Sequence, residues 1–439
     1  MKKRIGCYVI ILNLICFSFF LNCLSKGSGD SVRVIIDLGF SYQERSESVH
    51  SVFEYLLQIF TRDLFAQTAP SNIESLNLTI SASDMNTIEE SYAPVPESIE
   101  IEVSVGSARE FVIIANTPSA TLRGSSTVDL TAEEDVNITI SMNIYETKFI
   151  VPDEKNYRII QIDDISGNGW VSKTGTDLNL TSISIANFMP NDIDFDSRGR
   201  IYIANGTGNA ADDYVIRIDD ITDTNPEAII VQGLPIQSLT VDRNNSYLYY
   251  ATSSLLYRST LEGTGNVNLT ITNGVDQIQT IRGMSVDADG ILYIAGVNTE
   301  PAQRVFKYNP TSQNVDASYS SNLNSPCDTL IKDGTLYVAN TSAADGYKIL
   351  QLNRSLQLSG QYGNQSASAD SVPGNFYGPK MFIAILNRNI YFIDEGSINE
   401  PSGFEGDRLV EMEDILGSSW QTFGSTGVGD DQFRFYWAC

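Results

Sequence analysis

The spacing of apolar residues changes along this 439-residue chain. Residues 47–65, "ESVHSVFEYLLQIFTRDLF", place apolar side chains at i, i+3, i+4 and i+7, which predicts an amphipathic helix. From residue 75 onward the period is two, as in "SLNLTIS", "SIEIEVSV" and "VNITISMNI". Half-buried strands separated by turn residues, without helices, predict a small β-sandwich over residues 73–146.

Residues 147–439 repeat one alternating pattern. Five stretches each read as a strand, a tight polar turn and a second strand with a tyrosine, namely Tyr202, Tyr249, Tyr293, Tyr337 and Tyr391. A third strand follows each hairpin, and the tyrosines recur every 44–54 residues. A sixth copy, residues 148–170, precedes these five but lacks the first strand of its hairpin. About four strands per repeat, with no helix, is the pattern of a β-propeller.

Three motifs carry a family resemblance. "GQYGNQSASADSVPGNFYGPKMFIAI" and "FGSTGVGDDQFRFYW" each combine a Gly-rich turn with a phenylalanine three residues before a proline, with Tyr436 in place of the second proline. Together with "KFIVPDEKNYRII", they resemble the NHL-repeat family. The resemblance implies an all-β, six-bladed propeller over residues 147–439.

The end of the chain is expected to close this ring. "FRFYWAC" is the one first strand without a partner, and the copy at 148–170 needs one. One strand from the C-terminus and three from the N-terminus would then form a blade without a free edge. The alternative is that residues 138–143 leave the sandwich and fill that position. The sandwich itself resembles immunoglobulin-like or transthyretin-like modules of bacterial envelope lipoproteins, through "GSSTVDLTAEEDVNITISM".

The N-terminus reads as an export signal. Lys2, Lys3 and Arg4 precede an apolar run, residues 5–21, as in a secretory signal peptide. "FLNC" then resembles a bacterial lipobox, although Asn22 stands where a small residue is usual. The resemblance implies removal of residues 1–22 and a diacylglycerol and palmitate anchor on Cys23. A transmembrane anchor or soluble secretion are the alternatives. Residues 23–72 would be a tether with the amphipathic helix, and the protein is expected on a bacterial membrane, with the membrane and its face left open.

The amino-acid composition excludes several classes of binding and catalytic site. The net charge of −26 argues against nucleic-acid binding. The single histidine, His50, removes histidine-dependent triads and zinc sites from the repeat region. "DSRGR", "DADGI" and "KDGTL" are too short for calcium loops and predict hairpin turns. Cys327 and Cys439 are expected to be free thiols, because two blades apart exceeds the reach of a disulfide.

The candidate ligand site is one mouth of the central channel, where the inner strands begin. Its residues are Asn191, Asp192, Gln237, Arg282, Asp328 and Lys380. Similarity to sugar-lactone hydrolases among six-bladed propellers implies calcium at Asp192 and Asp328, with Arg282 or Lys380 orienting an anionic substrate. The alternative is that these residues are solvated strand ends and ion pairs.

The favoured interpretation is a monomeric, lipid-anchored envelope protein that binds or scaffolds a protein, peptide or glycan. It predicts no catalytic residue, no metal and no cofactor beyond the lipid on Cys23. A calcium-assisted lactone or ester hydrolase is the first alternative, and a surface adhesin is the second.

Overall fold

The computed structural model describes residues 31–40, 73–96, 98–117, 120–132, 135–178, 188–207, 213–222, 228–244, 246–300, 302–342, 346–365, 373–386, 389–395 and 406–435. Within these ranges the regular structure is β-strand, with one 3-10 turn at Glu154–Asn156 and no α-helix. None of these residues forms a helix long and apolar enough to span a membrane. The all-β fold class is confirmed, whereas the helix predicted over 47–65 and the lipidation site Cys23 lie outside the described residues.

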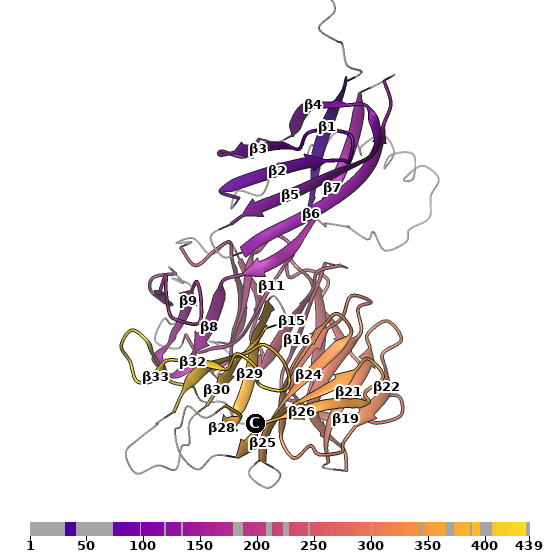
Figure 1. Cartoon of the computed structure of the whole chain (residues 1–439). Helices are drawn as coiled ribbons and strands as arrows, with labels where there is room; N and C mark the ends of the chain where they lie inside the picture. Colours follow the sequence, from indigo (N-terminus) through magenta and orange to yellow (C-terminus); the bar gives the residue numbers. More distant parts are fainter. Residues whose placement is uncertain are drawn as a thin grey trace, which may run out of the picture.

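Two parts follow each other along the chain (Figure 1). The N-terminal domain is a seven-stranded sheet with the order β3-β2-β5-β6-β7-β1-β4. Its strands are β1 (Ser31–Phe40), β2 (Ser75–Ser81), β3 (Ile88–Tyr92), β4 (Ile99–Ser104), β5 (Gly106–Asn116), β6 (Ala120–Leu130) and β7 (Val136–Thr147). The alternating segments predicted to be strands are therefore strands, and residues 138–143 lie in β7, paired with β1, so they do not fill the propeller position offered as an alternative.

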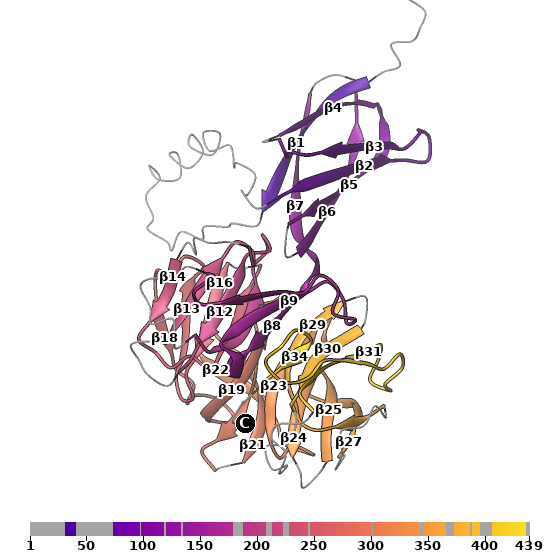
Figure 2. The same cartoon turned by 90° about the vertical axis from the view of Figure 1, so that its left-hand side faces the viewer.

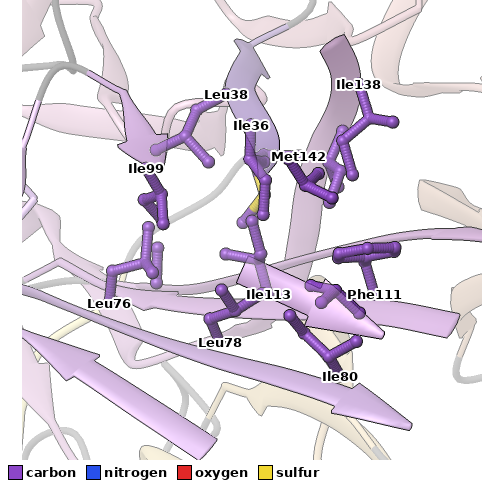
Figure 3. Packing of buried hydrophobic residues seen from close by; sticks show 14 of the residues in the cluster. Ile36, Leu38, Leu76, Leu78, Ile80, Ile99, Phe111, Ile113, Ile138 and Met142 are labelled. Carbon is purple, nitrogen blue, oxygen red and sulfur yellow. The ribbon is translucent and has the colours of Figure 1, made fainter. Parts of the chain in front are cut away.

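One apolar cluster holds the N-terminal domain together. It combines residues from β2 and β5 with residues from β1 and β4, so the two ends of the sheet enclose a common core. Figure 3 shows Ile36, Leu38 and Ile99 facing Leu76 and Leu78 across this core. Residues 31–40 were expected to be tether, but they form β1, because alternate residues of this segment are buried between β4 and β7.

The repeat region consists of five four-stranded antiparallel sheets after one three-stranded sheet. Sheet 1 is β8 (Phe149–Asp153), β9 (Arg158–Ile162) and β10 (Val171–Thr174). Sheet 2 is β11 (Pro190–Phe195), β12 (Ile201–Asn205), β13 (Tyr214–Ile218) and β14 (Ala228–Gln232). Sheet 3 is β15 (Ser238–Asp242), β16 (Tyr247–Ala251), β17 (Leu256–Thr260) and β18 (Val267–Leu269).

The remaining three sheets have the same order of strands. Sheet 4 is β19 (Ile278–Val286), β20 (Leu292–Asn298), β21 (Gln303–Asn309) and β22 (Asn314–Tyr319). Sheet 5 is β23 (Pro326–Lys332), β24 (Thr335–Ser342), β25 (Gly346–Asn353) and β26 (Leu358–Tyr362). Sheet 6 is β29 (Pro379–Leu386), β30 (Asn389–Asp394), β31 (Arg408–Met412) and β32 (Gln421–Phe423).

The predicted hairpins are confirmed at the first two strands of sheets 2 to 6. The turns that could be mistaken for calcium loops join these strands, and Gly199, Gly290 and Gly334 adopt φ of +77°, +76° and +79° there. The repeated tyrosine of the second strand is buried in sheets 2, 3, 4 and 6.

Successive sheets surround a common axis. The first strands contact each other in the order β11, β15, β19, β23 and β29, and we call these the inner strands. β8 contacts both β11 and β29, so sheet 1 is the neighbour of sheet 2 and of sheet 6 (Figure 2). Four-stranded antiparallel sheets arranged in this way form a β-propeller.

The chain direction gives the two ends of the propeller different surroundings. β7 of the N-terminal domain leads directly into β8, so the second strands of the sheets begin at the end nearest that domain (Figure 1). The inner strands are antiparallel to the second strands and therefore begin at the opposite end. We call this opposite end the far face. It carries the starts of the inner strands, the connections between second and third strands, and the connections from one sheet to the next.

The last described residues dock on sheet 1 at the far face. The Arg434 N–H donates to Asp153 Oδ1 at 2.7 Å, and the Lys155 N–H donates to the Arg434 carbonyl at 3.1 Å. The Arg158 guanidinium donates to the carbonyls of Gly429 and Gln432, at 3.0 and 2.8 Å. The C-terminal segment thus contacts residues 153–158, but its short strand β34 (Gln432–Phe433) pairs with β33 (Ser425–Thr426) and not with β8, so the described residues do not show the predicted strand pairing.

Sheet 6 has the same contacts with the residues that precede its own inner strand. Asp394 Oδ1 accepts the N–H of Tyr377 at 2.9 Å, and the Arg408 guanidinium donates to the Asn375 carbonyl at 2.6 Å. Phe376 packs on Trp420 at 5.5 Å between ring centroids, as Phe433 packs on Trp170 at 5.7 Å. We call these two equivalent sets of residues the sheet 6 cluster (Asp394, Arg408, Trp420, Phe376) and the sheet 1 cluster (Asp153, Arg158, Trp170, Phe433).

Candidate functional site

A recurring β-bulge shapes the channel mouth at the far face. The register between the inner and second strands shifts near the start of β11, β19, β23 and β29. The extra residues include Asn191, Arg282, Cys327 and Lys380, and β19 and β29 each have a second one, Gln279 and Ile383. A bulge leaves one residue unpaired and redirects its side chain. Three of the six positions selected from the sequence, Asn191, Arg282 and Lys380, are thus bulged residues, and Cys327 is a fourth.

Asn191 and Arg282 link neighbouring sheets. Asn191 Nδ2 donates to the carbonyl of Ile236, at the start of the next inner strand, at 3.1 Å. Arg282 Nη1 makes the corresponding bond to the Pro326 carbonyl at 3.3 Å, and it also donates to Ser325 Oγ at 3.1 Å. Burial lowers the pKa of Arg282. Both side chains therefore hold the ring of sheets together.

Asp192 and Asp328 make a second type of link, one residue further along. Asp192 Oδ2 accepts the Leu239 N–H and the Ser238 hydroxyl, each at 2.8 Å. Asp328 Oδ2 accepts the Phe382 N–H at 3.0 Å. The acceptor thus lies on one inner strand and the donor on the next. These carboxylates satisfy backbone donors along the open edge of an inner strand, which would otherwise remain unpaired.

The surroundings of these two carboxyl groups favour the protonated state. Burial raises the pKa of Asp328 to about 7. Burial, and then the charge of Asp328, raise the pKa of Asp192 well above its usual range. Both residues are only partly exposed to solvent.

The donor set does not fit the calcium site considered from the sequence. Calcium takes six to eight oxygen ligands, mostly from ionised carboxylates. Asp192 and Asp328 already accept backbone N–H groups from the next inner strand. Within the described ranges, no three His, Cys, Asp or Glu side chains lie close enough to hold a metal ion. We therefore derive no metal-assisted step here.

The remaining mouth residues are also engaged in structure. Lys380 Nζ lies 2.7 Å from Glu395 Oε2; the Glu395 side chain is buried and the Lys380 side chain is partly buried. The Gln237 N–H donates to the Ala251 carbonyl at 2.8 Å. Of the six residues selected from the sequence, five make contacts that join strands or sheets through their side chains, and Gln237 does so through its backbone.

The state of Cys327 differs from the free thiol predicted from the sequence. Its side chain is disulfide-bonded and buried, not a free thiol. The prediction assumed that the channel mouth separates inner strands too far for a bridge. It did not consider that the bulge at the start of β23 redirects the side chain of residue 327.

Sequence reasoning also missed the sheet 1 and sheet 6 clusters. Their signal is the repeat of "DISGNGW" at 164–170 in "DILGSSW" at 414–420. In each copy the aspartate caps the turn: Asp164 accepts the Ser166 N–H at 2.8 Å and Asp414 accepts the Leu416 N–H at 2.8 Å. The two copies place equivalent tryptophans on the first and last sheets.

Comparisons with known proteins add the following. No family model and no curated protein matches the chain. Among solved structures it is similar to hydrazine synthase of Kuenenia stuttgartiensis, with a TM-score of 0.39 and 11% identity, over 53% of this chain and 65% of that chain. It is also similar to the Cps50 (Swd1) β-propeller domain of Myceliophteria thermophila, with a TM-score of 0.41 and 10% identity, over 62% and 85% of the two chains.

A chain from the mitotic checkpoint complex is similar at a TM-score of 0.39 and 11% identity, over 65% of this chain and 75% of that chain. Likenesses this low carry no inference about function. The β-propeller fold follows from the sheets of this chain and their contacts.

Proposed function

We propose that this protein is an exported, lipid-anchored β-propeller that binds or scaffolds a protein, peptide or glycan through its far face. The observation that carries this proposal is the direction of the chain. β7 joins the propeller at the end opposite the far face, so the N-terminal domain attaches away from the proposed binding surface.

Exposed apolar side chains lie at both ends of the propeller: Val267, Leu358 and Leu416 at the end nearest the N-terminal domain, and four others on the far face. Tyr157, Leu255, Val275 and Val428 are 45%, 40%, 70% and 67% exposed. Each lies in a connection between second and third strands or between successive sheets, and these connections form the far face. Apolar side chains that gather on a surface are typical of an interaction site, and the far face carries four of the seven exposed ones in the described part of the propeller.

The architecture we propose is a six-bladed, NHL-type ring closed by the C-terminal segment and preceded by a sandwich-like spacer. The contacts of β8 with both neighbours and the matching sheet 1 and sheet 6 clusters support it. Export is supported by the disulfide of Cys327, because stable disulfides form in oxidising compartments. The lipid on Cys23 remains a proposal from the sequence. Two or more acyl chains would hold the protein on a membrane.

Photo-crosslinking in the cells that make the protein tests the binding face. A benzoylphenylalanine at position 255 should give discrete adducts of higher mass. The same residue at position 416 is the matched control, because Leu416 is exposed but lies in a turn between third and fourth strands, at the end nearest the N-terminal domain. Adducts from position 416 and none from position 255 would contradict the proposal.

Fractionation tests the anchor. Cys23→Ser should move the protein from the membrane to the soluble fraction. Retention of the variant on the membrane would mean that the apolar N-terminal run, not a lipid, holds it. Protease accessibility on intact cells then shows whether the far face is displayed outside, as an adhesin requires.

A further inference from the structure

The disulfide of Cys327 needs a partner. Cys327 is the bulged residue at the start of β23, at the far face, and it is 1% exposed. The other four cysteines, Cys7, Cys16, Cys23 and Cys439, lie outside the described residues. The geometry of the described part decides which of them has the reach.

The N-terminal cysteines start from the wrong end of the molecule. β1 is parallel to β7, and β7 ends at the propeller, so Ser31 lies at the end of the N-terminal domain away from the propeller. From there to the start of β23, the chain would have to pass the 12 residues of β7 and the 7 residues of β23. At about 3.3 Å per residue this path is roughly 60 Å long.

The chain before Ser31 is too short for this path from two of the three cysteines. At no more than about 3.6 Å per residue, the segment from Cys23 spans roughly 29 Å and that from Cys16 roughly 54 Å. The segment from Cys7 spans roughly 86 Å and is long enough. Cys7, however, lies in the segment that the proposed signal cleavage removes, and this step alone rests on the proposed function.

Cys439 starts from the correct place. The N–H of Phe435 donates to Asp407 Oδ2 at 3.3 Å, and the neighbouring Arg434 is bonded to Asp153. Asp407 precedes a third strand and Asp153 ends a second strand, so both lie at the far face, where Cys327 also lies. The four residues after Phe435 span up to about 14 Å.

We infer that Cys327 and Cys439 form the disulfide. The bond links the segment that docks on sheet 1 to the inner strand of sheet 5, past the end of sheet 6, which lies between them. In its formation the two thiols lose two protons and two electrons. A disulfide of an exported thiol oxidase, or oxidised glutathione during refolding in vitro, accepts both and becomes two thiols. The disulfide is therefore a covalent link between two sheets that are not neighbours, and it forms after export.

Peptide mapping without reduction tests the pairing on the full chain from the cell envelope. The expected result is one cross-linked peptide pair that contains residues 327 and 439 and separates on reduction. In Cys439→Ser, Cys327 should become alkylated by iodoacetamide under denaturing conditions without reduction. A cross-link from Cys327 to any N-terminal cysteine, or a free Cys327 thiol in the unmodified envelope protein, would overturn the inference.

Thermal unfolding gives a second readout. Dithiothreitol should lower the Tm of the unmodified protein by about 10 °C, because the bond closes a loop of more than 100 residues. It should leave the Tm of Cys439→Ser unchanged. If the protein proves to be cytoplasmic but pairs Cys327 with Cys439 when oxidised in vitro, the proposed location fails and the pairing stands.

Discussion

The N-terminal domain and the propeller bury different kinds of side chain. One continuous apolar cluster joins six of the seven strands of the N-terminal domain, with Arg109 and Thr117 as its buried polar side chains in the described part. The propeller divides its apolar core into six clusters between neighbouring sheets and buries carboxylates and arginines among them. A sheet that closes on one core needs few polar links, whereas a ring of separate sheets must satisfy the open edge of every inner strand.

The largest expected difference concerns the buried ion pair of sheet 6. Arg408 lies 2.9 Å from Asp394, and both are buried. Arg408→Met should lower the free energy of unfolding of the propeller by about 3–5 kcal/mol, because it leaves a buried carboxyl group without its cation. Tryptophan fluorescence during urea unfolding measures it, because Trp170, Trp420 and Trp437 all belong to the repeat region.

The matched control is the double variant Asp394→Asn, Arg408→Met. It removes both charges and should recover part of the loss. Equal losses in the single and the double variant would show that the arginine acts through packing on Trp420 and not through its charge.

A substitution in the apolar core of the N-terminal domain should be detected by circular dichroism and not by tryptophan fluorescence. Ile113 is fully buried there, and Ile113→Ala should cost about 2–5 kcal/mol. Circular dichroism should show the loss, while the tryptophan midpoint stays where it was. Ile101→Ala, at a partly buried position of the same cluster, should cost less. A shift of both probes together would mean that the two parts unfold as one unit.

The close approach of β19 and β23 at Gly283 predicts that a substitution there has a moderate effect on stability. A Cβ on Gly283 would lie 2.4 Å from Asp328 Oδ1 and 2.5 Å from the Cys327 carbonyl. Gly283→Ala should therefore destabilise the propeller by about 1–3 kcal/mol. Gly360→Ala is the control, since its nearest neighbours are side-chain atoms at 3.2 Å. Equal stability of the two variants in the urea titration would argue against this packing of β19 on β23.

The smallest expected effect is the change of stability with pH, and its sign differs between the propeller and the N-terminal domain. Burial raises the pKa of Asp328 to about 7 and that of Asp394 to about 6, from an ordinary 3.8. Between pH 4 and 7 the folded propeller therefore holds protons that the unfolded chain has lost, and its stability should fall as the pH rises. The hydrogen bond from Arg109 lowers the pKa of Asp84, so its contribution in the N-terminal domain is lost as the pH falls.

Urea midpoints at pH 5 and pH 8, followed by tryptophan fluorescence, test this slope. Asp328→Asn should flatten it, because the amide cannot titrate. A slope that Asp328→Asn leaves unchanged would assign the effect to Asp394 and the other buried carboxyl groups.

Much of the fold follows from local patterns. Two-residue alternation and the repeated tyrosine predict the hairpins of sheets 2 to 6, because each hairpin is short in sequence. The strand at residues 31–40 could not be assigned in this way, since its partners β4 and β7 are distant in sequence.

The candidate site residues lie near the starts of inner strands, as the sequence predicts, but their contacts could not be read from the sequence. The sequence shows that Asp192 and Arg282 stand near the starts of inner strands, but not that their hydrogen-bond partners lie on the next sheet. Those partners are 44–47 residues away and become visible only when the sheets are placed side by side.

Closure of the propeller by the C-terminal segment is the central claim, and hydrogen exchange tests it directly. Two forms should be compared: a chain that ends at Phe423, and Cys439→Ser, which lacks the proposed disulfide but keeps the segment that docks on sheet 1. We predict that the shortened chain loses protection in β8 and β9, while β1 to β7 are unchanged and Cys439→Ser stays largely protected. Full protection of β8 and β9 in the shortened chain would contradict the account.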